Sequence, residues 1–331
     1  MNAACYVFVA GGYELILLTI LKSSFFSSLE IGLLYALMAL GVYITFRILD
    51  FPDLTVDGSF TTGAAIAAIM ISNGTPAWIA CVAAFIGGLA AGACTGLLHT
   101  KGKINGLLSG ILMMIALYSI NLRILGRPNV SLLGADTIFS DLPRKVWEFT
   151  SITLVMLVVT LVFKLALDWF MKTDLGLALR ATGDNKRMIR SFGANTDTTT
   201  IVGVSLSNGL VALSGAFIAQ QSGFADITMG IGMIVIGLAS VIIGEAIFGA
   251  KTVFRATIAV ILGSIVYRFV VAIALQIKWF ESSDLKLITA IIVIIALVVP
   301  TIRRVLKQNA MAKIRSAELL GSGSQSKGGR G

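Results

Sequence analysis

Charged residues are scarce in this chain. Asp, Glu, Lys and Arg make up 13% of its 331 residues, about half the fraction that is usual in a soluble domain. Apolar residues make up 56%, and several runs reach the roughly 20 residues that cross a bilayer as a helix. A transmembrane barrel would alternate apolar and polar residues along its strands, which these long runs exclude. The sequence therefore predicts an all-α polytopic membrane protein.

Residues that carry chemistry are also few. The chain has one histidine, His99, and three cysteines, Cys5, Cys81 and Cys94, which lie in apolar runs without a CxxC pair. One histidine without neighbouring ligands does not assemble a metal site. No GxxxxGK[ST] phosphate loop, GxSxG elbow or HExxH helix occurs. We therefore expect no catalytic residue, metal or cofactor in this chain; if its function is driven by ATP, the ATPase that holds ATP and Mg²⁺ is another chain.

Positive charge exceeds negative charge, with a formal net charge of +9. The cations concentrate in short loops and in the carboxyl-terminal tail, where orientation in a membrane explains them, because Lys and Arg near helix ends are retained in the cytoplasm. No aromatic residues interleave with the basic runs, so we expect contact with membrane lipids and no binding of nucleic acid.

The apolar runs predict about ten (eight to ten) transmembrane helices. They form a transmembrane domain over residues 1–302, with halves at about 4–125 and 149–302, followed by a basic cytoplasmic tail at 303–331 that we expect to be disordered. Met1–Lys22 lacks the basic start and the cleavage site of a signal peptide. The predicted spans are Ala4–Leu21, Leu29–Ile48, Gly58–Ser72, Pro76–His99, Ile104–Leu125, Phe149–Met171, Thr199–Ala219, Met229–Phe248, Phe254–Leu275 and Leu285–Ile302.

A short internal repeat links the two halves. Phe51–Gly58 reads FPDLTVDG and Phe224–Gly230 reads FADITMG, so Phe, Asp, an aliphatic residue, Thr and a second aliphatic residue coincide. Five predicted spans separate the two copies, and an odd offset reverses their orientation in the membrane. This pattern indicates an inverted repeat of two five-helix halves.

Polar residues in and beside the apolar runs are candidates for a translocation pathway, because such groups usually face protein, water or a ligand. Asp53 and Asp226 have a second interpretation, as N-caps of the helices that follow them. A second interpretation also exists for the polar residues deep in their spans, which could form hydrogen bonds between helices. These residues are Asn121, Arg123 and Asn208. Both interpretations stay open. The candidate pathway residues are Asp53, Thr55, Asp57, Asn121, Asn208, Asp226 and Thr228.

The segment Lys172–Asp197 is the only long polar stretch in the middle of the chain. Its cations place it in the cytoplasm, and Met188, Ile189 and Phe192 recur at helical spacing. We predict an amphipathic helix on the cytoplasmic surface that docks a soluble partner. Elsewhere, Glu245 at the end of its span either pairs with Lys251 or contacts the same partner.

The run LGLALRATGDNKRMIRSFGANTD resembles the cytoplasmic coupling segment of the permease subunits of bacterial ABC importers, in the group that includes the branched-chain amino acid and ribose-type permeases. The resemblance extends from about Leu29 to Arg304. It implies that a docking helix at Leu175–Gly193 contacts an ABC ATPase. The ATPase-coupling residues that it implies are Leu175, Gly176, Arg180, Gly183, Asp184, Asn185, Arg187, Gly193 and Glu245.

Three further runs, FPDLTVDGSF, INLRILGRPN and GMIVIGLASVIIGEAIFG, are similar to permeases in this group that are described as importers of amino acids, aromatic ones among them. Branched-chain members differ at Phe51–Phe60, so a branched-chain substrate is not implied. The resemblance implies a multi-pass protein of the bacterial cytoplasmic (inner) membrane that assembles with a second permease copy as a homodimer, or with a different permease. Two ABC ATPases and an extracytoplasmic solute-binding protein, which docks on Gly126–Glu148, complete the assembly.

The sequence thus favours the non-catalytic permease subunit of an ATP-driven importer for a small polar solute, an amino acid. The alternative is an ion-coupled secondary transporter. It requires an ionisable residue near the middle of the membrane, and the chain offers only Arg123 and the carboxylates at the edges of spans. A membrane scaffold or channel does not explain the coupling segment.

Overall fold

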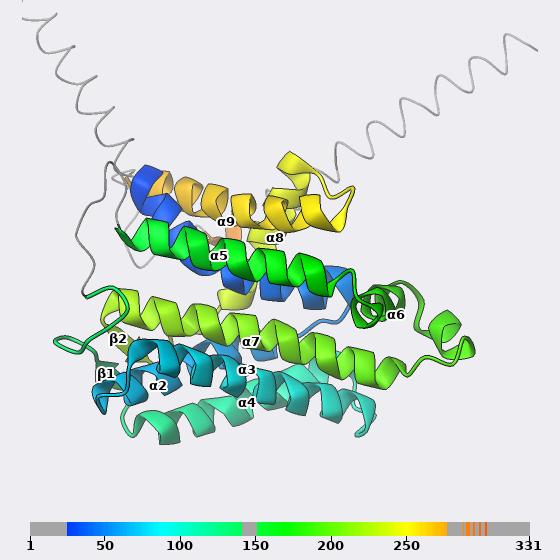
Figure 1. Cartoon of the computed structure of the whole chain (residues 1–331), viewed down its shortest axis with the longest axis horizontal. Coiled ribbons are helices and arrows are strands. Elements are labelled where there is room, and N and C mark those ends of the chain that lie inside the picture. The colour runs from blue at the N-terminus through cyan, green and yellow to red at the C-terminus, as the bar shows by residue number, and fades with distance from the viewer. Residues whose placement is uncertain are drawn as a thin grey trace, which may run out of the picture.

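The computed structural model describes residues 25–140 and 151–276, with a few positions between 287 and 302. This part of the chain is mostly helical, and its two short strands, β1 (Asn129–Ser131) and β2 (Phe224–Asp226), pair antiparallel. In Figure 1, α6 lies at one end of the bundle and the β1–β2 pair at the opposite end. The helices are Phe25–Ile48, α2 (Thr55–Ser72), α3 (Ala77–Thr100), α4 (Gly106–Leu125), α5 (Ser151–Phe170), α6 (Asp174–Ser191), α7 (Thr196–Ser222), α8 (Met233–Phe248) and α9 (Val253–Gln276).

Seven of the described helices are long and apolar enough to cross a membrane, namely Phe25–Ile48, α2, α3, α4, α5, α7 and α9. The predicted class of all-α polytopic membrane protein is therefore confirmed. The predicted number of about ten spans is not confirmed, since α8 is apolar but only 16 residues long. The predicted span 4–21 and the tail 303–331 lie outside the described residues, as does the predicted span 285–302 apart from isolated positions.

Two predicted boundaries differ from the structure for a physical reason. The eighth predicted span was expected to begin at Met229, but α8 begins at Met233, because residues 224–232 form β2 and a series of turns. α2 begins at Thr55 rather than Gly58, since Asp53 accepts a hydrogen bond from the Thr55 amide at 2.9 Å and so starts the helix earlier.

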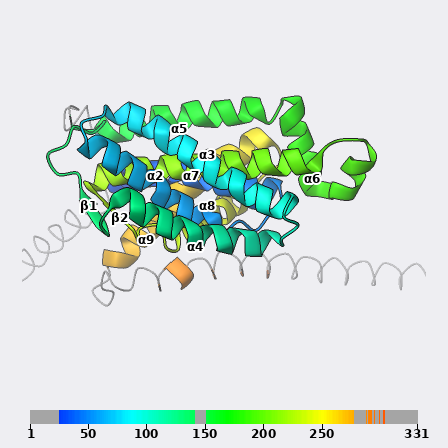
Figure 2. The same ribbon diagram turned by 90° about the horizontal axis from the view of Figure 1, so that it is seen from below.

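α7 lies at the centre of the described bundle, packed against α2 and α3. In its most apolar stretch 78% of the residues are buried, against 22% for α4, which runs along one edge of the bundle in Figure 2. Two glycines bring the backbones of α2 and α7 into contact. A Cβ on Gly63 would lie 1.8 Å from the Ala212 carbonyl oxygen, and one on Gly215 would lie 2.0 Å from that of Phe60.

The chain is broken at both copies of the internal repeat. Helix Phe25–Ile48 ends in a π-helical turn, Tyr43–Ile48, and Asp50 (φ 51°) then redirects the chain towards α2. The second break, at 224–232, precedes α8. The second break contacts the first turn of α2, because a Cβ on Gly230 would lie 2.1 Å from the Asp57 carbonyl oxygen. The contact brings the repeat copies together, whereas the inverted symmetry of two five-helix halves stays a prediction.

The contact between α2 and α7 predicts that Gly63→Ala destabilises the protein. The added methyl group would meet the backbone of Ala212, so the two central helices must move apart, which costs about 1–3 kcal/mol for an overpacked core. We expect a lower thermal unfolding temperature in detergent, measured by tryptophan fluorescence.

Gly87→Ala is the matched control for this prediction. Its Cβ would meet the Cδ1 atom of Ile66, the end of a flexible side chain that can move away. An unfolding temperature that falls equally in both variants would contradict the assignment of the α2–α7 contact as the critical one.

Candidate functional site

α6 is a pair of short helices rather than one helix. Thr173 precedes it and accepts a hydrogen bond from the Gly176 amide at 3.3 Å, and the backbone leaves the helical region at Asn185 (φ −157°, ψ 91°). The side chain of Asn185 then accepts a hydrogen bond from the Met188 amide at 3.1 Å and so begins the second piece. The prediction of one continuous docking helix over 175–193 is therefore wrong at Asn185.

The first piece of α6 is fixed to the ends of two membrane helices. A Cβ on Gly183 would lie 1.8 Å from the Ile48 carbonyl oxygen, so the backbone of α6 lies directly against the end of helix Phe25–Ile48. Thr182 shares a hydrogen bond of 3.0 Å with Thr199 near the start of α7. Displacement of this piece would consequently act on both membrane helices.

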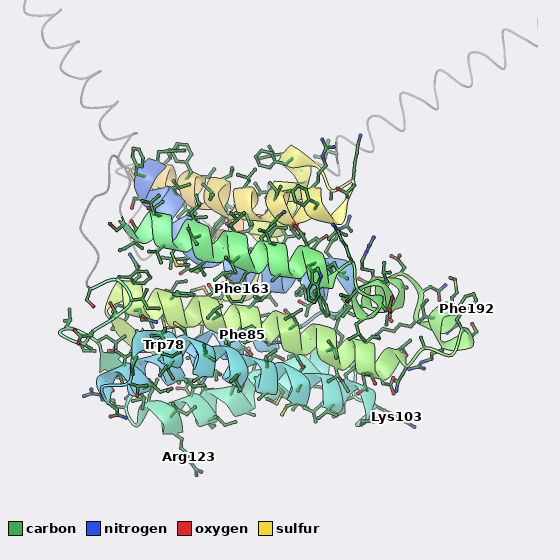
Figure 3. The ribbon with its side chains drawn as sticks, in the orientation of Figure 1. Trp78, Phe85, Lys103, Arg123, Phe163 and Phe192 are labelled. Atoms are coloured by element: carbon green, nitrogen blue, oxygen red, sulfur yellow. The ribbon has the colours of Figure 1, made fainter. Side chains whose placement is uncertain are left out.

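The predicted coupling residues divide into packing residues and exposed residues. Gly176 is buried, where a Cβ would lie 2.2 Å from the Phe170 carbonyl oxygen, and Gly183 is half-buried. The apolar stripe that the sequence predicted is exposed to solvent as well. Phe192, at the far end of α6, is 78% exposed (Figure 3). The exposed coupling residues are Leu175, Arg180, Asp184, Asn185, Arg187 and Gly193.

Glu245 pairs with Arg47 and not with Lys251. The Arg47 Nε atom donates to the Glu245 carboxylate at 2.9 Å, which joins the end of α8 to the end of helix Phe25–Ile48. The residue after Arg47 is Ile48, which contacts Gly183. Glu245 is therefore connected to the α6 attachment point through its own ion pair.

Three of the predicted pathway residues form a closed cluster. The Asp53 carboxylate accepts the Asn208 side-chain amide at 2.7 Å, and the Thr55 hydroxyl shares a hydrogen bond of 2.8 Å with Thr95. Asp53, Thr55 and Asn208 are each 0% exposed. They link α2, α3 and α7 and do not line an open pathway, which favours the interpretation of Asn208 as a contact between helices.

The Asp53 carboxylate binds the first amide of α2, although Leu54 and not Asp53 occupies the N-cap position. The capping interpretation is wrong for Asp226. Asp226 accepts hydrogen bonds from the amide and hydroxyl of Thr228, at 2.8 and 2.5 Å, in a local turn outside the spans. These bonds hold the pKa of Asp226 below its ordinary value. α8 begins only at Met233, beyond the reach of Asp226, because the turns at 227–232 intervene.

The cap of α8 comes from the other repeat copy. Asp57, on the first turn of α2, accepts hydrogen bonds from the amides of Gly232 at 2.9 Å and Ile234 at 2.8 Å, more than 170 residues away in sequence. Sequence reasoning placed Asp57 among the pathway residues but missed this role. The second Asp of FPDLTVDG, which the later copy lacks, was the available signal.

A cavity of about 490 Å³ lies beside this cap. Asn121 is 1% exposed in its wall and donates to the Gly58 carbonyl at 3.1 Å, while its Oδ1 atom has no hydrogen-bond partner among the described residues. A few polar groups in apolar walls are typical of a small-molecule site. The lining residues are Asp57, Gly58, Thr61, Met114, Ile115, Tyr118, Ser119, Asn121, Ile227 and Ile231.

The cavity therefore unites some of the predicted pathway residues. Asp57 and Asn121 line it, and Thr228, which is exposed, follows the lining residue Ile227. Arg123 was expected to be deeply embedded, but its side chain is exposed on the last turn of α4 and points away from the bundle in Figure 3.

Sequence reasoning missed a buried ion pair in α5. Lys164 and Asp168 pair within the helix and are 2% and 6% exposed. Asp168 also accepts the Thr257 hydroxyl at 2.8 Å, and the Lys164 ammonium lies 3.3 Å from the ring centre of Phe254, so the pair joins α5 to α9. Opposite charges four residues apart inside an apolar run were the available signal.

Comparisons with known proteins agree on one family. The family model described as branched-chain amino acid transport system / permease component matches residues 24–298. The chain is 45% identical, over 82% of its length, to 90% of a tyrosine transport system permease protein of Clostridioides difficile. An autoinducer 2 import system permease protein of Salmonella typhimurium is 30% identical to this chain. That alignment covers 57% of this chain and 52% of the relative.

One solved structure supports the fold. The structure of PsaBC from Streptococcus pneumoniae in complex with Fab contains a chain that aligns with 81% of this chain over 89% of its own length, with a TM-score of 0.50 and 13% sequence identity. This likeness concerns the arrangement of helices alone.

The cap formed by Asp57 predicts that Asp57→Asn destabilises the protein. One of the two carboxylate oxygens becomes an NH₂ group, which cannot accept the hydrogen bond from either amide, and an unsatisfied buried donor costs about 1–3 kcal/mol. We expect a lower unfolding temperature in detergent. Asp226→Asn removes the same charge from a half-buried residue that binds only near neighbours outside the spans, and should have little effect; equal losses in the two variants would contradict the cap.

Proposed function

Because the chain belongs to the family of branched-chain amino acid transport system permease components, we propose that it is the membrane subunit of an ATP-driven importer of an amino acid. The proposed substrate is tyrosine or a related aromatic amino acid, by similarity to the relative of Clostridioides difficile. The proposed assembly contains two copies of this chain and two ABC ATPases, which hold ATP and Mg²⁺, in the cytoplasmic membrane of a bacterium.

The observation that carries the proposal is the attachment of α6. Its exposed residues, among them Arg180 and Asp184, are available to a partner, while its backbone at Gly183 lies against Ile48 and its Thr182 hydroxyl is bonded to Thr199. An ATPase that moves α6 on binding ATP would therefore push two membrane helices at once as a rigid body.

The same contacts lead from α6 towards the candidate pathway. From Ile48 the chain runs directly into the break at 49–54, where Asp53 is held by Asn208, and then into the first turn of α2. That turn carries Asp57, which holds the start of α8 and lines the 490 Å³ cavity. Switching between outward-facing and inward-facing states would act on the cavity through these bonds.

The exposed face of α4 supports pairing with a second copy. α4 is the least buried of the seven spans, and large apolar side chains such as Leu112, Ile115 and Tyr118 are 44%, 60% and 50% exposed on it. Ile115 and Tyr118 also line the cavity. A second permease copy against this face would close the cavity into a pathway between the two subunits.

The end of the bundle opposite α6 suits a solute-binding protein. The β1–β2 pair and the described part of the loop 126–148, which extends to residue 140, lie there (Figure 1). If α6 is cytoplasmic, these segments face the outside, where a solute-binding protein delivers the substrate.

The ion-coupled alternative receives no specific support. It requires an ionisable group that faces the pathway, but Lys164 and Asp168 pair with each other between α5 and α9 and are absent from the cavity walls. Asp57 does line the cavity, and both of its oxygens are engaged by amides of α8.

Transport assays test the proposal as a whole. The assay uses proteoliposomes that contain this chain, its cognate ATPase and its solute-binding protein. We expect uptake of labelled tyrosine that requires ATP on the side of the membrane that carries the ATPase, and that requires no ion gradient. Uptake that follows an imposed proton or sodium gradient without ATP would contradict it.

A substitution in the cavity tests the pathway in the same assay. Ser119→Trp fills part of the cavity and should abolish most uptake while the complex still assembles. The control Ile86→Trp adds a comparable ring to an exposed position of α3 outside the cavity and should leave uptake intact.

Charge reversal on α6 tests the docking element. Asp184→Lys changes an exposed side chain without touching the Gly183 contact, so the fold should be retained while binding of the ATPase weakens about tenfold or more, as for a lost interfacial charge pair. Co-purification of the ATPase is measured. Asp136→Lys, on the exposed loop at the opposite end, is the control; unchanged ATPase binding by Asp184→Lys would contradict docking at this residue.

A further inference from the structure

A second cavity, of about 720 Å³, lies between the later piece of α6, the start of α7 and the loop that joins α3 to α4. It is at the α6 end of the bundle, where Lys103 is labelled in Figure 3. The residues that give it its character are Lys103, Asn105, Lys186, Arg190, Asn195 and Asp197. None of the proposed steps of transport uses this cavity.

The charge of the cavity is unbalanced. Its lining contains three cations, Lys103, Lys186 and Arg190, and one carboxylate, Asp197. Arg190 already uses that carboxylate, at 2.9 Å, and the Thr196 hydroxyl, at 2.7 Å. Lys103 and Lys186 have no ion pair or hydrogen bond with other residues in the described part of the chain. The carboxylates of Asp197 and Asp50 attract Lys186 from a distance, so neither ammonium group is in direct contact with a carboxylate.

Burial makes this excess costly. Lys186 is half-buried, and its partial burial, followed by the charge of Arg190, lowers the pKa of its ammonium group below the ordinary value. A cation that is penalised in this way is stabilised by any anion that enters the cavity.

Two helix starts add to the positive potential. Asn105 begins α4 and accepts the Leu107 amide at 3.0 Å, while Asn195 begins α7 and accepts the Asp197 and Thr198 amides at 3.1 and 3.2 Å. Both cap residues line the cavity, so the positive ends of both helix dipoles meet there.

The loop that carries Lys103 is held in an unusual shape. Lys103 has a left-handed backbone (φ 54°), which is unfavourable for a residue with a side chain. The His99 imidazole fixes the following residue by donating from Nδ1 to the Ile104 carbonyl at 2.8 Å. Lys103 therefore reaches the cavity from a fixed loop rather than from a free one.

We infer that this cavity binds a phosphate-bearing anion, which joins the α3–α4 loop to the later piece of α6. The three cations come from segments more than 80 residues apart in sequence, and an anion between Lys103 and Lys186 would bridge them. Two sources supply this chemistry: the headgroup of an anionic lipid in the cytoplasmic leaflet, and a soluble phosphate compound. The tendency of Lys and Arg to stay in the cytoplasm explains why these three cations lie on the same side of the membrane. It does not explain why all three line one cavity.

Binding to the full chain, purified in neutral detergent, tests the inference. Thermal unfolding and native mass spectrometry are measured with phosphatidylglycerol, with inorganic phosphate, and with phosphatidylcholine as the reference. We expect stabilisation and a bound adduct with at least one of the two anions. A shift with the lipid alone identifies a lipid headgroup as the ligand, and a shift with inorganic phosphate identifies a soluble one.

Variants separate this cavity from general surface charge. In Lys103→Gln/Lys186→Gln the affinity for the effective anion should fall about tenfold or more, because each charge-assisted contact contributes that much. Lys101→Gln removes one positive charge from an exposed residue of the same loop that does not line the cavity, and should bind as before. Lys103→Arg/Lys186→Arg changes the same two positions but keeps both charges and should retain binding, which separates loss of charge from misfolding.

Two results would overturn the inference. One is the absence of a shift with either anion in the unchanged protein. The other is an equal loss of binding in Lys101→Gln and in Lys103→Gln/Lys186→Gln, which would mean that the anion associates with the basic surface and not with the cavity.

Discussion

The described structure depends on satisfying the backbone where membrane helices are broken. Amides and carbonyls that leave a helix within the bilayer must find partners in the protein, since hydrocarbon offers none. Asp53 binds the first amide of α2, Asp57 binds two amides at the start of α8, and Asn121 binds the Gly58 carbonyl. These three side chains hold the segments around both breaks in place, and the 490 Å³ cavity lies where the second break meets the first turns of α2 and the later half of α4.

The membrane class, most helix positions and the location of α6 follow from periodicity and charge, which are local properties of a sequence. The short repeat was visible in the sequence, but only the structure shows that its two copies touch, at Asp57 and Gly230. Asp57 was named as a polar residue of interest, but its partner lies far along the chain. No local pattern shows which helix a carboxylate caps when the helix belongs to another segment.

Other features were missed because a side chain overrides the general tendency of its neighbours. The helical pattern of α6 is continuous by spacing, yet Asn185 ends one piece and begins the next by binding the Met188 amide. Glu245 had a nearby lysine in sequence, but folding brings Arg47 closer. Lys164 and Asp168 look unfavourable in an apolar run until Thr257 and Phe254 of α9 are seen to surround them. Each of these depends on tertiary contacts.

Asp57 occupies two environments at once, since the oxygens that hold the first turn of α8 also belong to the wall of a cavity. An ammonium group that entered the cavity and took one of these oxygens would compete with an amide of α8 for it. Occupancy of the cavity and order at the start of α8 are then thermodynamically linked, and the linkage is reciprocal: whatever loosens that turn strengthens the hold on the cation by the same factor. On the proposed function, a single carboxylate would thereby convert the arrival of a solute into a change of helix geometry.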